Sequence, residues 1–255
     1  MLKKLKKYQF LFEELVKRDF KQKYKRTVLG MGWSILSPLL TLLVMKIVFT
    51  TFFGRNTPNY TTYLFSGTLV MAYFKESTKS GMNSLMSNAK IFSKINIPKY
   101  MFLLSKNVSA LINFAIILVV YFIFAALDNI RFGFHMISLI YPVACLLIFN
   151  IGIGLILSAM YVFFRDTTYL YDVFLTLLNY LSAIFYTVDN FSPVIQKLFL
   201  LNPIYCYIKY FRTVVISGHL PSVPYHLLCA FYAVVAIVVG GYIYKKNNHK
   251  FLYYV

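Results

Sequence analysis

The chain has 255 residues, of which 59% are hydrophobic and only 13% charged, and its mean hydropathy is +0.65. These values exclude a water-soluble globular domain and predict an all-α integral membrane protein that crosses the bilayer several times. The net charge of +18 is compatible with nucleic-acid binding, but no soluble stretch is left to carry such a site. Anionic lipid headgroups therefore account for the charge better than nucleic acid does.

The first element is a basic segment with regularly spaced aromatic residues. In a helix, Phe12 and Phe20 lie on one ladder, whereas Lys21 and its basic neighbours fall mostly opposite, with Asp19 blurring the edge. Such a helix lies in the plane of the headgroups. We therefore expect residues 1–30 to form an amphipathic helix on the cytoplasmic surface.

Six apolar runs follow, and we assign them as transmembrane helices within residues 31–255. They cover residues 31–53, 61–74, 100–127, 136–161, 170–188 and 225–244. As a helix the first run is about 34 Å long, against a hydrocarbon core of ~30 Å. The second run is short, and Lys75, Glu76 and Lys79 at its far end are predicted to mark the cytoplasmic boundary.

Most of the 26 Lys and Arg residues fall on the side of the N-terminus when the loops are counted alternately. By the positive-inside rule, both termini are cytoplasmic. This pattern is typical of a multi-pass protein of the bacterial cytoplasmic membrane, and the first segment is too basic over too long a stretch for a cleavable signal peptide.

Two cytoplasmic loops and one outer segment stand apart from the spans. Residues 84–98 have apolar positions at near-helical spacing and end at Pro98, so a short surface helix is expected there. Such loops either cap the membrane surface or dock onto a cytosolic partner. The same two interpretations apply to the tight loop at Arg165 and Asp166. Residues 190–218 are too interrupted to cross the bilayer and are expected to form two re-entrant half-helices on the outer side.

Polar and aromatic side chains on the spans are candidates to line a wet conduit, because passage of a long polar cargo needs many shallow contacts. Packing between helices or contact with lipid is the competing explanation for each aromatic residue. For Lys46, lining a pore and snorkelling outward both remain open. The candidate channel residues are Trp33, Ser37, Thr41, Lys46, Tyr180, Phe185 and Tyr186.

Catalytic motifs are absent from the sequence, including the phosphate-binding loop of ATPases. The cysteines Cys145, Cys206 and Cys229 lie far apart and are expected to be small apolar fillers. We expect no cofactor on this chain, and any energy for its work must come from another chain.

The stretch RDFKQKYKRTVLGMGWSILSPLL resembles the N-terminal signature of permease subunits of ABC-type exporters for polysaccharides, O-antigen and teichoic acids. Three further stretches match in the same order, so that the resemblance covers nearly the whole chain: NAKIFSKINIPKY, FFRDTTYL and LNPIYCYIKYFR. One departure is that the family often has Trp near the inner end of the second span, where this chain has Ala72, Tyr73 and Phe74.

The resemblance implies a six-span permease that pairs with a second copy of itself and two cytosolic ATPase subunits to move a lipid-linked polysaccharide outward. It also implies roles for three sets of residues. The gate helix would meet the lipid pyrophosphate through Arg18, Lys21, Lys23, Tyr24 and Lys25. The ATPase would be contacted by Asn88, Ile91, Lys94, Pro98, Arg165 and Asp166. The re-entrant helices at the exit would contribute Asn202, Pro203, Tyr207 and Arg212.

Two other functions remain as alternatives. An exporter of drugs or lipids would share the architecture, although it would lack an amphipathic helix joined so directly to the first span. An integral-membrane transferase acting on a lipid-linked sugar needs a base or a metal-binding carboxylate cluster. At the cytoplasmic face this chain offers only Asp166 and Asp172 for that purpose, so transport is favoured.

Overall fold

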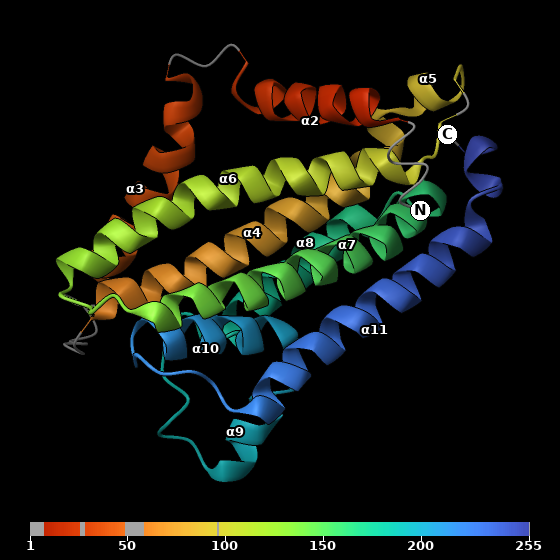
Figure 1. The fold of residues 1–255 in the computed structure, drawn as a ribbon. Helices are drawn as coiled ribbons and strands as arrows, with labels where there is room; N and C mark the ends of the chain where they lie inside the picture. Colours follow the sequence, from red (N-terminus) through yellow and green to blue (C-terminus); the bar gives the residue numbers. More distant parts are fainter. Residues whose placement is uncertain (1–7, 26–28, 49–58, 96, 255) are drawn as a thin grey trace.

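The computed structural model describes residues 8–25, 29–48, 59–95 and 97–254, and these residues form helices and turns without any strand (Figure 1). The helices are α2 (Gln9–Tyr24), α3 (Trp33–Ile47), α4 (Tyr60–Ser87), α5 (Ala89–Phe92), α6 (Tyr100–Leu127), α7 (Ile140–Phe163), α8 (Thr167–Leu181), α9 (Pro193–Phe199), α10 (Pro203–Val215) and α11 (Val223–Asn247), with short 3-10 helices η1 (Gly30–Gly32), η3 (Phe134–Leu139) and η4 (Lys250–Leu252). The all-helical fold class is confirmed.

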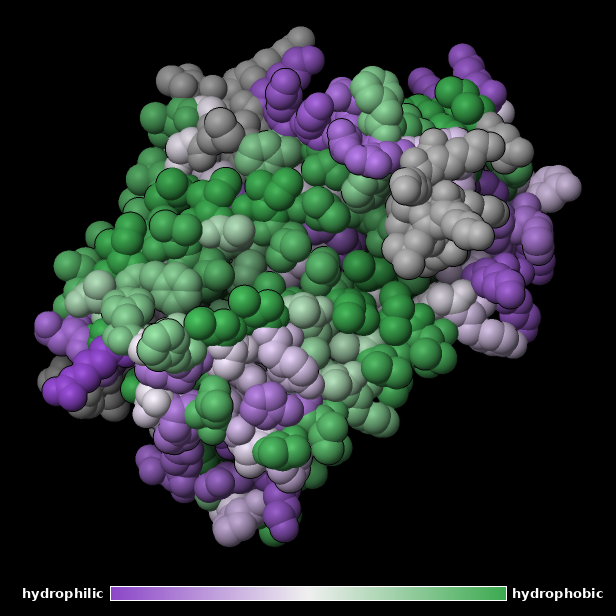
Figure 2. Space-filling view, in the orientation of Figure 1, coloured by the Kyte–Doolittle hydropathy of each residue, from purple (hydrophilic) through white to green (hydrophobic). Residues whose placement is uncertain are grey.

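Within the described residues, three helical stretches are long and apolar enough to cross a bilayer: α6, the continuous Phe134–Phe163, and α11. Helix α3 is apolar but has only 15 residues, and residues 49–53 of the predicted first span lie outside the described residues. Figure 2 shows hydrophobic side chains across the middle of the visible face and hydrophilic ones toward its ends. The chain is therefore a multi-pass membrane protein.

Helix α4 differs most from its predicted span. It continues past residue 74 to Ser87, which makes it about 42 Å long. The reason is that its second half is buried through small polar side chains: Ser77 donates to Asn107 of α6 at 2.5 Å, and Thr78 accepts from Tyr171 of α8 at 2.6 Å. The helix therefore extends beyond the predicted span, and the charges at positions 75, 76 and 79 lie inside the helix.

Helix α8 ends at Leu181 and is therefore shorter than its predicted span of residues 170–188. The chain then turns through Ala183, whose φ is +50°, and Asn202 donates to the Leu181 carbonyl at 3.1 Å and the Ser182 hydroxyl at 3.0 Å. Phe185 consequently lies in a turn instead of on a membrane-crossing helix, as does the neighbouring Tyr186.

Helix α10 begins at Pro203, directly after its capping residue Asn202. Pro203 occupies the first turn, where its missing N–H costs nothing, and the Asn202 side chain accepts from Ile204 N and Tyr205 N. The helix is then largely buried, because aromatic and aliphatic side chains cover most of its surface. Tyr207, expected at the exit, is fully buried, and its hydroxyl donates to the Cys229 carbonyl at 2.9 Å.

Arg212 was also expected at the exit, but it is only 8% exposed. Its guanidinium donates to the carbonyls of Ala183 and Ile184 at 2.8 and 3.0 Å and lies 3.4 Å from the centre of the Tyr63 ring. It also donates to the Ser66 hydroxyl at 3.2 Å. Arg212 therefore fixes the turn after α8 against α4 instead of facing a vestibule.

The closest helix crossing joins α7 and α11. A Cβ placed on Gly152 would lie 2.6 Å from the Ile237 nitrogen, and one on Gly240 would lie 3.0 Å from the Gly152 carbonyl carbon and closer still to its oxygen. Glycine at both positions lets the two backbones touch, which is a common way to pack helices in membranes.

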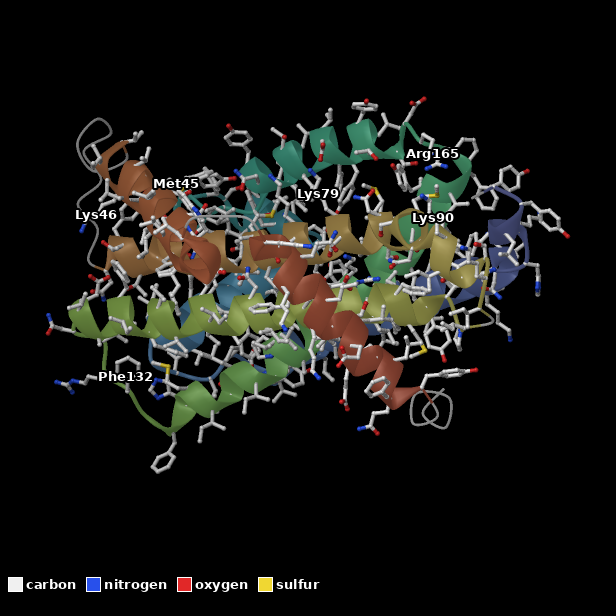
Figure 3. The ribbon with its side chains drawn as sticks, turned by 90° about the horizontal axis from the view of Figure 1, so that it is seen from above. Met45, Lys46, Lys79, Lys90, Phe132 and Arg165 are labelled. Atoms are coloured by element: carbon white, nitrogen blue, oxygen red, sulfur yellow. The ribbon has the colours of Figure 1, made fainter. Side chains whose placement is uncertain are left out.

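The three cysteines are buried and free, as expected of apolar fillers. Seen from above, Lys90 and Arg165 lie at one end of the bundle and Lys46 and Phe132 at the other (Figure 3). We call the first the α5 end. It also holds the start of α6 and the end of α11 (Figure 1).

Candidate functional site

Helix α2 lies against α6 through one apolar and one charged contact. Leu15 is 4% exposed and packs in a cluster with Leu85 and Phe102, whereas Asp19 is 6% exposed. Asp19 thus belongs to the buried face, although the sequence pattern placed it at the edge of the helix. The helix ends at Tyr24, sooner than the expected residue 30, and residues 26–28 lie outside the described residues.

Asp19 is the anchor of α2 because its buried carboxylate is fully partnered. Arg18 and Lys106 contact it at 2.8 and 2.9 Å, and the Ser105 hydroxyl donates to it at 2.8 Å. A buried charge is tolerated only with such partners. Helical periodicity alone does not reveal this, since Ser105 and Lys106 come from α6, about 86 residues further along the chain.

A second polar contact joins α2 to the break between α4 and α5. Arg18 donates to the Asn88 side chain at 2.8 Å, and Asn88 in turn donates to the Ser84 carbonyl at 2.8 Å. Asn88 was expected to contact an ATPase, but it is only 2% exposed. Its contacts instead hold α2 to the end of α4.

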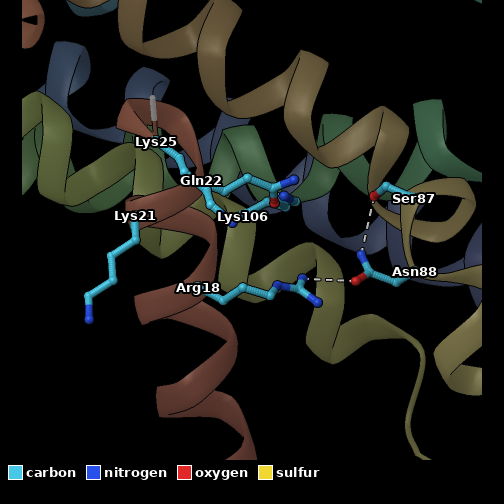
Figure 4. A pocket seen from close by; sticks show the side chains of 7 residues that line it. All are labelled: Arg18, Lys21, Gln22, Lys25, Ser87, Asn88 and Lys106. Carbon is cyan, nitrogen blue, oxygen red and sulfur yellow. Dashed lines mark hydrogen bonds between the residues drawn. The ribbon is translucent and has the colours of Figure 1, made fainter. Parts of the chain in front are cut away.

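Between these contacts lies a pocket of about 800 Å³ (Figure 4). Its lining residues are Arg18, Lys21, Gln22, Lys25, Ser87, Asn88 and Lys106. Four of the seven are cations, and none is a carboxylate. Arginine and lysine on a concave surface are suited to bind phosphate, through charge-assisted hydrogen bonds. The pocket is therefore a candidate anion site.

The five residues assigned to the gate helix separate into two groups. Arg18, Lys21 and Lys25 line the pocket. Lys23 points elsewhere and contacts Glu76 of α4 at 2.7 Å, while the side chain of Tyr24 lies outside what the structure describes. The pocket also contains Gln22 and Lys106, which sequence reasoning missed.

The open side of α4 carries a further set of polar residues that sequence reasoning missed. We call Lys75, Glu76, Lys79, Ser80, Asn83 and Ser87 the polar stripe; all are exposed or half-buried. Glu76 also accepts from Asn113 at 2.8 Å, and Lys79 contacts Asp172 of α8 at 2.5 Å. The stripe was missed because its charges were interpreted as the end of a span.

The residues predicted to line a channel are all exposed or half-buried. Trp33, Ser37 and Thr41 lie on α3, and Lys46 lies near its far end, remote from α5 (Figure 3). Tyr180 ends α8, and its carbonyl accepts from the Tyr186 hydroxyl at 2.8 Å. None of these side chains is buried, so burial does not contradict their predicted role.

The other predicted coupling residues, like Asn88, lie toward the α5 end. Lys94, Arg165 and Asp166 are exposed, whereas Ile91 and Pro98 are half-buried. The helix expected over residues 84–98 is in fact divided, because residues 84–87 complete α4 and only four residues form α5.

A larger cavity of about 1130 Å³ lies between the start of α6, α7 and the end of α11. Its walls are mainly apolar, and of the predicted site residues it includes only Pro98. The pocket beside α2 is therefore the stronger candidate for a polar ligand.

Apolar spanning helices, a cationic pocket under an N-terminal helix and an exposed basic end together define a helical membrane transport protein. The chain belongs to the ABC-2 type transporter family, whose model matches residues 11–216. It is 26% identical over 251 residues to the O-antigen export system permease protein RfbA of Klebsiella pneumoniae, with 95% of each chain covered. It is 24% identical over 255 residues to RfbA of Myxococcus xanthus, with 98% of this chain and 97% of the relative covered. The polysialic acid transport protein KpsM of Escherichia coli is 18% identical over 243 residues, with 94% of each chain covered.

Proposed function

We propose that the chain is the permease subunit of an ATP-driven exporter that moves a lipid-linked polysaccharide from the cytoplasmic to the outer side of the bacterial cytoplasmic membrane. The observation that carries this function is the similarity to O-antigen export permeases over nearly the full length of both chains. Similarity to a polysialic acid transport protein over a comparable length points to the same class of cargo.

The cationic pocket suits the diphosphate of a lipid carrier. Arg18 is held in place by Asp19 and Asn88, so it is preorganised to donate to a phosphate, and Lys106 adds a second cation from α6. The flanking Lys21 and Lys25 are exposed and can meet headgroups at the membrane surface. The N-terminal helix then acts as a gate that admits the lipid anchor.

Two copies of this chain would form the conduit between them. The α3 and α8 faces that carry Trp33, Thr41 and Tyr180 are exposed in the single copy, and apolar faces of this kind pack against lipid or another subunit. The shallow aromatic and hydroxyl contacts of these faces suit a sliding glycan. Helices α9 and α10 would stand at the outer exit as a re-entrant pair, with both termini cytoplasmic.

Two cytosolic ATPase subunits would bind the α5 end and carry ATP and Mg, so that this chain needs no cofactor of its own. Exposed Lys94, Arg165 and Asp166 supply charged contacts at this end. Residues 89–95, residues 97–98 and the turn between α7 and α8 are the segments of the described chain best placed to receive the ATPase.

Deleting the gene in the bacterium that encodes the chain tests this function. Polysaccharide should disappear from the cell surface while its lipid-linked form accumulates inside, and the wild-type gene should restore export. Arg18→Ala should restore it poorly, whereas Lys197→Ala, a change at an exposed site on α9, should restore it fully. Normal surface polysaccharide after deletion, with altered drug or lipid efflux, would overturn the proposal in favour of the other kind of exporter.

A further inference from the structure

The polar stripe begins inside the cationic pocket and leaves it along α4. Ser87 lines the pocket, and Asn83, Lys79 and Glu76 follow at intervals of three or four residues, so they share one face of the helix. From Ser87 to Glu76 the stripe covers about 17 Å at 1.5 Å per residue. It therefore extends well beyond the pocket.

The stripe reaches the level of the membrane's apolar region. Residues 108–127 of α6 contain no charged side chain, and Asn113, about 8 Å into that stretch, donates to Glu76 at 2.8 Å. A carboxylate at this depth is costly unless it faces protein or water. The half-exposed Glu76 is thus a sign that the open side of α4 is wet.

Two ion pairs join neighbouring helices to the stripe. Lys23 of α2 contacts Glu76 at 2.7 Å, and Lys79 contacts Asp172 of α8 at 2.5 Å. The side chains in the first pair are 40% and 30% exposed, and in the second 34% and 47%. Ion pairs this exposed are weak and exchange readily, so another anion can replace either carboxylate.

We propose that the polar stripe is a second binding site for the anionic head of the transported lipid. Glu76 and Asp172 occupy Lys23 and Lys79 in the empty protein, and a diphosphate that leaves the pocket displaces them. A diphosphate carries more charge than a carboxylate, so it forms the stronger charge-assisted hydrogen bond to a lysine. This inference rests on the proposed function, because it assumes that the cargo carries a phosphate-bearing lipid.

The proposal predicts opposite effects for the two members of each pair. Removing a carboxylate, by Glu76→Gln or Asp172→Asn, frees a lysine and should tighten binding. Removing a cation, by Lys23→Gln or Lys79→Gln, should weaken it. A purely structural role predicts the same direction for both members, since either change breaks the same ion pair.

Binding can be followed at a cysteine introduced by Ala72→Cys, one turn beyond Glu76 and exposed on the same side of α4. The full chain is placed in phosphatidylcholine nanodiscs and treated with a water-soluble thiosulfonate, with the buried native cysteines as background. Farnesyl diphosphate is the probe, and phosphatidylglycerol tests whether ordinary anionic lipid suffices. Glu14→Gln and Lys17→Gln are matched controls, because this exposed pair lies elsewhere on α2.

We expect farnesyl diphosphate to protect the cysteine at position 72. The half-protecting concentration should fall about five-fold in the carboxylate variants and rise about five-fold in the lysine variants, as expected for one exposed charge contact each. The control variants should stay near wild type. Shifts in one direction for both members of a pair, or a cysteine that never reacts, would overturn the second site.

Equal protection by phosphatidylglycerol would overturn its assignment to a lipid diphosphate. Failure of the proposed function is recognised separately, because it is scored by surface polysaccharide after gene deletion and not by protection of position 72.

Discussion

The contact between α7 and α11 gives the sharpest stability prediction, because two adjacent glycines of α11 differ in what surrounds them. A Cβ on Gly240 would lie 3.0 Å from the Gly152 carbonyl carbon and closer to its oxygen, whereas a Cβ on Gly241 would meet nothing within 4 Å. The neighbouring atoms at Gly240 are backbone, so they cannot rotate away. Gly240→Ala therefore forces the two helices apart.

The magnitude follows from the distance that must be recovered. Carbon and oxygen atoms in helix interfaces normally approach to ~3.3 Å, so the backbones must separate by about 1 Å to clear the Gly152 oxygen. A gap of that size loses about half of the dispersion energy of the atoms involved, and overpacking of this kind costs about 1–3 kcal/mol. For a chain of this length the expected fall in Tm is roughly 2–12 °C.

Thermal unfolding in detergent, followed by the loss of the monodisperse peak in size-exclusion chromatography, measures the difference. Gly241→Ala is the matched control and should unfold at or slightly above the wild-type temperature, because alanine restricts the unfolded chain. Equal Tm values for the two variants would refute the idea that backbone contact at Gly152 holds these helices together.

Three further predictions concern single polar side chains. Asp19→Asn removes the charge that holds Arg18 and Lys106, so trypsin should cleave α2 about ten-fold faster, for a loss of ~1.4 kcal/mol in local stability; an unchanged cleavage rate would contradict the anchor role. Arg212→Met should destabilise the chain by about 3–5 kcal/mol in thermal unfolding, because buried carbonyls lose a charged donor. Arg212→Lys should be intermediate, and a wild-type Tm for the Met variant would refute the account. Asn202→Ala should cost about 1–2 kcal/mol by loss of the α10 cap, whereas Asn202→Asp should keep the cap and lose only the amide's bonds to the turn after α8; equal loss would show that the cap contributes nothing.

Local patterns in the sequence were sufficient for much of the fold. Hydropathy predicted the membrane class and the extents of α6, α7 and α11 to within a few residues. These features depend on composition and helix length, which are properties of neighbouring residues.

The predictions that failed concern contacts between segments that are distant in the sequence. The continuation of α4 beyond the predicted span was missed because Lys75 and Glu76 look like a membrane boundary. In the structure, Asn113 and Lys23 contact the Glu76 carboxylate. Arg212 was placed at an outer surface, since an arginine surrounded by backbone carbonyls and an aromatic ring has no signature in the linear chain.

The candidate site was predicted in part for the same reason. Arg18, Lys21 and Lys25 share one side of α2, which periodicity reveals, and they line the pocket. Lys106 and Asn88 complete it from elsewhere in the chain, and only folding brings them there. A basic helix in sequence thus indicated the sign of the ligand's charge, but not the shape that receives it.

The long burial of α4 limits how this molecule can change shape. That helix packs directly on α3, α6, α7 and α10, so it cannot slide alone without disrupting most of the protomer's interior. Helix α2 instead packs mainly on a single helix, α6, where the buried Leu15 and Asp19 hold it. Movement of α2 therefore disrupts fewer helix contacts than movement of α4, so a change of shape in this protomer is expected to begin at α2.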